Sequence, residues 1–89
     1  MDGREWVAEY NEEALCCDGA DEAIVGICHQ FGRPPVAVYD LKRYIQILVD
    51  GGMTEEEAEE YWSFNVVGAW MGEGTPVFIE FMEPNDASP

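Results

Sequence analysis

Two apolar segments on either side of a glycine- and proline-containing break constrain this chain more than any other feature. Residues 23–31 and 36–39 are rich in β-branched and aromatic side chains, which is typical of strands. Residues 32–35 (Gly-Arg-Pro-Pro) interrupt them. Because this connection is short, we expect an antiparallel hairpin, and its prolines argue against a tight two-residue turn. The rest of the chain must then pack on that hairpin.

The segment after the hairpin has the pattern of an amphipathic helix. Asp40 is a favourable N-cap, Tyr39 and Tyr44 occupy the two positions of a hydrophobic staple, and Gly51 and Gly52 provide an end signal. Apolar side chains recur on one helical face, namely Leu41, Ile45, Leu48 and Val49. The sequence therefore predicts a helix that begins after Asp40 and ends at the glycine pair.

A second helix begins with the clearest local signal in the chain. Thr54 and Glu57 have the spacing of a capping box, and glutamates at 55–57 complement the positive end of the helix dipole. The helix should end near residues 67–68. Its predicted apolar stripe consists of Ala58, Tyr61, Trp62, Asn65, Val66 and Ala69.

The two ends of the chain supply the remaining elements. Residues 77–81 predict a last strand, with Glu80 outward and three side chains inward: Val77, Ile79 and Phe81. Residues 5–15 fit either a short helix or an edge strand, held to the core by Trp6, Tyr10 and Leu15. This order predicts an α+β fold: a small three-stranded, mainly antiparallel sheet with two helices on one face (β-β-α-α-β) plus a short N-terminal element. With 89 residues we expect one domain, 1–83, and a frayed polar tail, 84–89.

The charge balance narrows the classes of partner. There are 19 acidic and 4 basic residues, for a formal net charge of −15, yet 47% of the chain is hydrophobic, which excludes the disordered class. Such charge opposes direct binding to nucleic acid or anionic lipid and favours a basic partner. No apolar run reaches the roughly 18 residues of a membrane span. Met1–Trp6 lacks the pattern of a leader, so we expect a cytoplasmic protein.

Three cysteines and one histidine are the candidate metal ligands and nucleophiles. Cys16, Cys17 and Cys28 form an odd set that favours reduced thiols over a disulfide framework. A zinc site that adds His29 is the alternative, but adjacent cysteines point apart and lack the usual ligand spacing. Cys28 and His29 lie on opposite faces of a strand, which disfavours a nucleophilic pair. We therefore predict no metal, no cofactor and no enzymatic activity.

Three of the four basic residues, Arg33, Lys42 and Arg43, lie in the middle third of the chain. Lys42 and Arg43 fall in a first helical turn, where the dipole disfavours cations. Either they pair with nearby acids, for instance in the N-terminal segment, or they form an anion pocket with Arg33. The loop at 72–76 is glycine-rich but lacks the residues of a phosphate-binding loop.

Several blocks of the sequence resemble a family of small, largely uncharacterised bacteriophage and prophage proteins. The resemblance spans residues 12–79, and its distinctive parts are Phe64-Asn-Val-Val-Gly-Ala-Trp70 and Gly72-Glu-Gly-Thr-Pro76. It implies a phage origin and an early or accessory role, and it offers no catalytic residues.

The acidic residues support two interpretations. They are a solvated helix face, which salt adaptation could also produce, or they imitate the spaced phosphates of nucleic acid. The second predicts a phage accessory protein that inhibits a host defence or nucleic-acid-processing complex through its basic groove, as anti-CRISPR and anti-restriction proteins do. A small-molecule or nucleotide binder and a virion or assembly component are the alternatives. The predicted partner-binding residues are Glu9, Glu12, Glu13, Asp18, Asp21, Glu22, Glu55, Glu56, Glu59 and Glu60.

Overall fold

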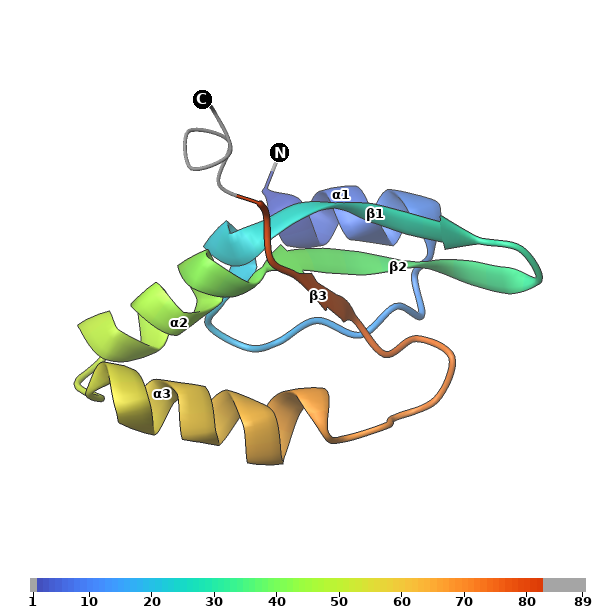
Figure 1. Cartoon of the computed structure of the whole chain (residues 1–89). Helices are drawn as coiled ribbons and strands as arrows, with labels where there is room; N and C mark the ends of the chain where they lie inside the picture. Colours follow the sequence, from blue (N-terminus) through green and yellow to red (C-terminus); the bar gives the residue numbers. More distant parts are fainter. Residues whose placement is uncertain (1, 83–89) are drawn as a thin grey trace, which may run out of the picture.

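The computed structural model describes residues 2–82 and has an α+β fold, as the sequence predicts. A mixed three-stranded sheet has the order β1-β2-β3, with β1 and β2 antiparallel and β2 and β3 parallel (Figure 1). The tail predicted at 84–89 lies outside the described residues. The elements are α1 (Gly3–Tyr10), the 3-10 turn η1 (Asp21–Ala23), β1 (Ile24–Gln30), β2 (Arg33–Asp40), α2 (Leu41–Asp50), α3 (Glu55–Tyr61), the π-helical segment η2 (Trp62–Val67) and β3 (Val77–Ile79).

The hairpin turn is tighter than the prolines suggested. Gln30 pairs with Arg33, so only Phe31 and Gly32 form the turn, and the expectation of a longer connection is wrong. Gly32 supplies the positive φ of +77° that this turn requires. The two prolines that follow lie inside β2, whose other edge pairs with β3 only at its last three residues. Because these prolines lie outside the paired stretch, their lack of a backbone N–H costs no hydrogen bond to β3.

Both predicted helix starts are confirmed. The carboxylate of Asp40 accepts the backbone N–H of Lys42, and the staple is formed because the rings of Tyr39 and Tyr44 lie 6.4 Å apart, edge to face. After α2, Gly52 takes a φ of +118°, as the glycine pair predicted. Thr54 forms its reciprocal capping box at the start of α3.

The N-terminal element is a helix, which resolves the alternative between helix and strand. Asp2 and Glu5 form a second capping box at its start. Val7 is the buried residue that holds α1 to the core, whereas Tyr10 is 49% and Leu15 38% exposed, so the predicted anchors are wrong in these two cases. The helix lies so close to β1 that a Cβ atom at Gly3 would come within 2.9 Å of the Ile24 side chain.

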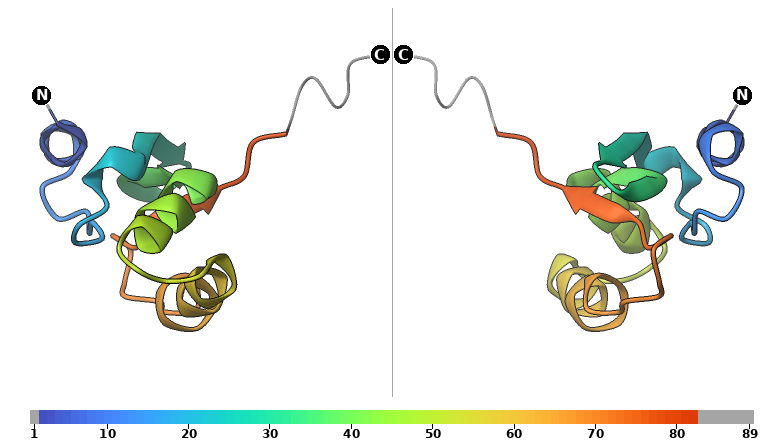
Figure 2. Two further views of the ribbon diagram at one scale, coloured as in Figure 1. Left: turned by 90° about the vertical axis from the view of Figure 1, so that its left-hand side faces the viewer. Right: turned by 90° about the vertical axis from the view of Figure 1, so that its right-hand side faces the viewer.

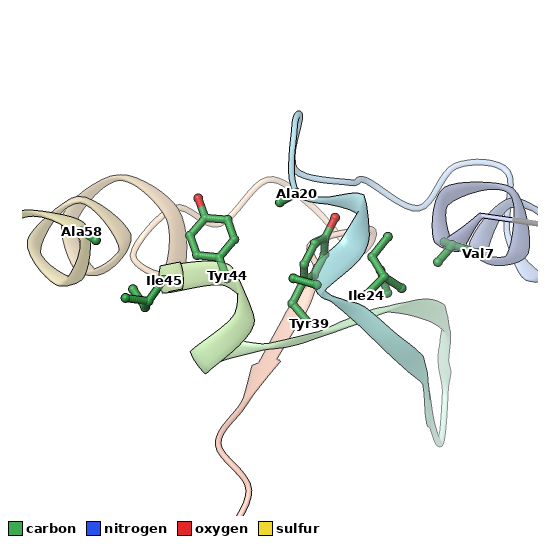
Figure 3. Close-up of a cluster of buried hydrophobic side chains, with 9 residues drawn as sticks. Val7, Ala20, Ile24, Tyr39, Tyr44, Ile45 and Ala58 are labelled. Atoms are coloured by element: carbon green, nitrogen blue, oxygen red, sulfur yellow. The ribbon is translucent and has the colours of Figure 1, made fainter. Parts of the chain in front are cut away.

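The core is a row of side chains that runs from α1 through the sheet to α3. Tyr39 is fully buried at its centre, and Figure 3 shows Val7 and Ala58 at the two ends of the row. Phe78 stacks on Tyr39 at 5.2 Å between ring centroids. Because Phe78 pairs in register with Tyr39, the core side of β3 is the side of Phe78, and the predicted inward set is wrong. β3 also ends at Ile79, which leaves Phe81 outside the strand and 58% exposed.

Candidate protein-binding surface

The glutamates of α3 are exposed and electrostatically unpaired within the described chain. Glu55, Glu56, Glu59 and Glu60 are all exposed, and none forms an ion pair with another residue of the range 2–82. Glu57 instead closes the capping box, where its carboxylate accepts the backbone N–H of Thr54. Ala58 is the only buried residue of α3, so this helix packs through one small side chain and its glutamates face outward.

The helix continues from these acids into an exposed apolar segment. Phe64 is 78% exposed and Val67 51% exposed, and Trp70 and Met71 are also largely exposed in the following loop. Large exposed apolar side chains next to one another mark an interaction site more often than a free surface. We call the combined area the α3–η2 surface, and it consists of Glu55, Glu56, Glu59, Glu60, Tyr61, Phe64, Val67, Trp70 and Met71.

Sequence periodicity agrees with part of this exposure, because the predicted apolar stripe leaves out Phe64 and Val67. A period of 3.6 residues places Tyr61 and Asn65 on the buried stripe, but both are exposed, so that part of the predicted stripe is wrong. Each π-turn contains one more residue than an α-turn, and the faces rotate relative to an ideal helix. Trp62 and Val66 still pack against the core.

A groove lies beside this surface, between α2 and α3. Its volume is about 830 Å³, and residues of both helices and Glu80, just after β3, line it. The apolar part of the lining consists of Leu41, Ile45, Val49 and Trp62. Glu55 and Glu59 lie on the α3 side of the groove. The α3–η2 surface therefore borders a concave, partly apolar site.

The N-terminal acids are spread between α1 and the η2 end of the molecule, where Asp18 lines a hollow together with Tyr61 and Val67. Glu9 belongs to α1, and Glu12, Glu13, Asp18, Asp21 and Glu22 follow it along the chain. Figures 1 and 2 show α1 and α3 far apart, with the sheet and α2 between them. Arg4 Nη2 lies 3.1 Å from Asp21 and 3.6 Å from Asp18, and the hydrogen bond to Asp21 raises the pKa of Arg4. The structure thus places Glu9 far from the α3 acids, whereas Asp18 lies beside the η2 end of the α3–η2 surface.

The basic residues do not come together in an anion pocket. Arg33 lies at the start of β2, and its guanidinium is 6.0 Å from the ring centroid of Trp70. Arg43, on α2, lies 3.7 Å from the carboxylate of Asp40, which is the N-cap of the same helix. Its acidic partner is therefore Asp40 and not a residue of the N-terminal segment. Lys42 lines the groove described above.

The cysteines and the histidine also remain apart. His29 is exposed on β1, where its ring meets Tyr10 at 5.7 Å. The backbone N–H of Cys17 donates to the Tyr39 hydroxyl at 2.7 Å, and burial raises the pKa of the Cys17 thiol. All three cysteines are free thiols. Among residues 2–82, no three His, Cys, Asp or Glu side chains are arranged to hold a metal ion.

Two further findings concern the chain as a whole. No described helix is both long and apolar enough to cross a membrane. Comparison with protein-family models, curated proteins and solved structures found no match. The functional argument therefore rests on the geometry of the α3–η2 surface and its groove.

Proposed function

We propose that this chain is a binding protein that docks its α3–η2 surface onto a positively charged surface of a partner protein. The partner is a host complex that normally holds nucleic acid, and the bound chain inhibits it by occupying its basic groove. This role agrees with the resemblance to small bacteriophage proteins. The observation that carries the proposal is the set of exposed α3 glutamates without ionic partners among the described residues, followed directly by exposed apolar side chains.

The charge supports this role through the physics of nucleic-acid grooves. A groove lined with lysine and arginine gains affinity when bound phosphates release their counterions, and a row of carboxylates can take the place of phosphate. The overall charge of −15 also speeds the encounter with a cationic partner. Binding of this kind should weaken steeply as salt concentration rises.

The exposed apolar side chains of the α3–η2 surface supply binding energy that its charges alone do not. Exposed ion pairs contribute little affinity, about 0–1 kcal/mol each. Buried aromatic and large apolar side chains carry most of the energy in protein interfaces, and Phe64 and Trp70 are suited to that role. We therefore expect the acids to set the rate and specificity of binding, and the aromatic side chains to set its lifetime.

A charge-reversal experiment with a matched control tests the proposal. The test variant carries Glu56→Lys, Glu59→Lys and Glu60→Lys, and the control carries the same reversal in the N-terminal acids, at Glu9, Glu12 and Glu13. Both change the net charge equally. Affinity capture from lysate of the bacterial host is followed by measurement of the salt dependence of binding. The captured complex is then assayed for binding of labelled nucleic acid.

The proposal predicts that the test variant loses the partner, that the control keeps most of the binding, and that bound wild-type protein displaces nucleic acid. Circular dichroism confirms that each variant is folded. Equal loss in both variants would mean that bulk charge alone explains the capture. Binding that is insensitive to salt and survives the α3 reversal would refute the proposal.

A further inference from the structure

The groove between α2 and α3 has a composition that suits one type of side chain. Its apolar lining comes from α2, through Leu41 and Ile45 among others, and from Trp62 at the start of η2. Three carboxylates stand around this lining on two different elements, Glu55 and Glu59 on α3 and Glu80 after β3, and all three are exposed. Lys42 is the basic residue of the lining, so the groove has a formal charge of −2, from three carboxylates and one ammonium.

A second observation concerns Trp62, a residue of the groove lining whose signal can report on the site. Trp62 contributes to the lining, and its indole N–H is buried without an acceptor among residues 2–82. Buried donors in folded proteins are nearly always paired.

We propose that this groove receives an arginine side chain from an amphipathic segment of the partner. The aliphatic part of the side chain lies on the Leu41, Ile45 and Trp62 lining, and the guanidinium faces the carboxylates. Arginine fits better than lysine because its planar guanidinium is more weakly hydrated and binds carboxylates in a bidentate manner. This inference rests on the proposed function and adds where, and by which chemistry, the basic partner is recognised.

A titration with a defined peptide tests the inference without knowledge of the partner. The probe is a short amphipathic helical peptide of arginine, leucine and alanine, and the matched control peptide has citrulline in place of each arginine. Citrulline keeps the shape of the side chain and removes its charge. Binding is followed by two-dimensional NMR of the full chain, in which the indole N–H signal of Trp62 reports directly on the groove. Trp62→Phe assigns that signal among the 3 tryptophans.

Two double variants with equal charge change locate the site. Glu59→Gln with Glu80→Gln removes carboxylates of the groove, whereas Glu56→Gln with Glu60→Gln removes carboxylates outside it. We expect the arginine peptide to shift the Trp62 indole signal and the α2 and α3 amides. We also expect the groove variant to bind about tenfold more weakly and the control variant to change by no more than about threefold.

Each other outcome has a distinct meaning. Equal binding of the citrulline peptide, or equal weakening in both double variants, overturns the assignment of an arginine site. Signal changes confined to residues 64–71 overturn the groove but leave the proposed function intact. Absence of any peptide binding also overturns the groove. Peptide binding in the groove combined with a failed α3 charge-reversal experiment refutes the proposed function and keeps the arginine site.

Discussion

Replacing Tyr39 by phenylalanine removes one hydrogen bond from the centre of the core and leaves the packing of the ring in place. The Tyr39 ring is fully buried, and its hydroxyl accepts the Cys17 backbone N–H at 2.7 Å. A buried donor left without an acceptor costs about 1–3 kcal/mol. Because Cys17 is only half-buried, water can reach part of this region, and we expect a loss of about 1–2 kcal/mol in the free energy of unfolding.

Urea unfolding followed by tryptophan fluorescence and circular dichroism measures this loss. For a domain of this size, 1 kcal/mol corresponds to a change of about 4–8 °C in Tm. The matched control is Tyr44→Phe, since the Tyr44 ring is also buried but its hydroxyl, which bonds to no other residue of the range 2–82, reaches solvent. The control should change stability by less than about 0.5 kcal/mol. Equal effects in the two variants would show that the hydrogen bond to Cys17 contributes nothing specific.

Four further predictions concern the geometry of caps, glycines and a buried tyrosine. Thr54→Ala removes the cap of α3 and should cost about 1 kcal/mol, measured by thermal unfolding; an unchanged Tm would argue against the capping box. Gly74→Ala should destabilise by about 1–3 kcal/mol, because its Cβ would lie 2.8 Å from the carbonyl oxygen of Glu13. Gly51→Ala should be neutral or stabilise by up to about 1 kcal/mol, because its nearest atoms lie at 3.5 Å, and the same sign in both glycine variants would contradict the geometry. Burial raises the pKa of Tyr44 to about 12. Since an unfolded tyrosine ionises near pH ~10, stability should be lost as pH rises from about 10 to about 12, and Tyr44→Phe should reduce this loss in alkaline urea titrations.

The local signals of the sequence were sufficient where a few neighbouring residues complete the interaction. The N-cap at Asp40, the Tyr39–Tyr44 staple and the capping box at Thr54 all form as predicted. The positive φ of Gly52 also follows the prediction. Each of these involves groups within five positions of one another, so the geometry of one helical turn decides the outcome.

Features that depend on partners distant in the sequence were predicted less well. The face of β3 follows from its pairing with β2, which puts Phe78 beside Tyr39 and leaves Phe81 outside the strand. The exposure of Tyr61 and Asn65, which a period of 3.6 residues places on the buried stripe, is decided by how α3 and η2 pack on the core. The groove between α2 and α3 also draws Glu80 from beyond β3, a placement that has no local signature.

The strong negative charge can be counted from composition, but its arrangement is a tertiary property. Counting shows that the acids concentrate in the first quarter of the chain and after residue 53. Packing then places Glu9 of α1 far from the α3 acids but brings Asp18 beside Tyr61 and Val67, and Arg4 engages two of the N-terminal acids. The α3 acids are left outward because Ala58 is the only fully buried residue of their helix. Side-chain chemistry is a property of each residue, whereas a surface arises only when the chain's apolar contacts decide which residues are neighbours and which remain in water.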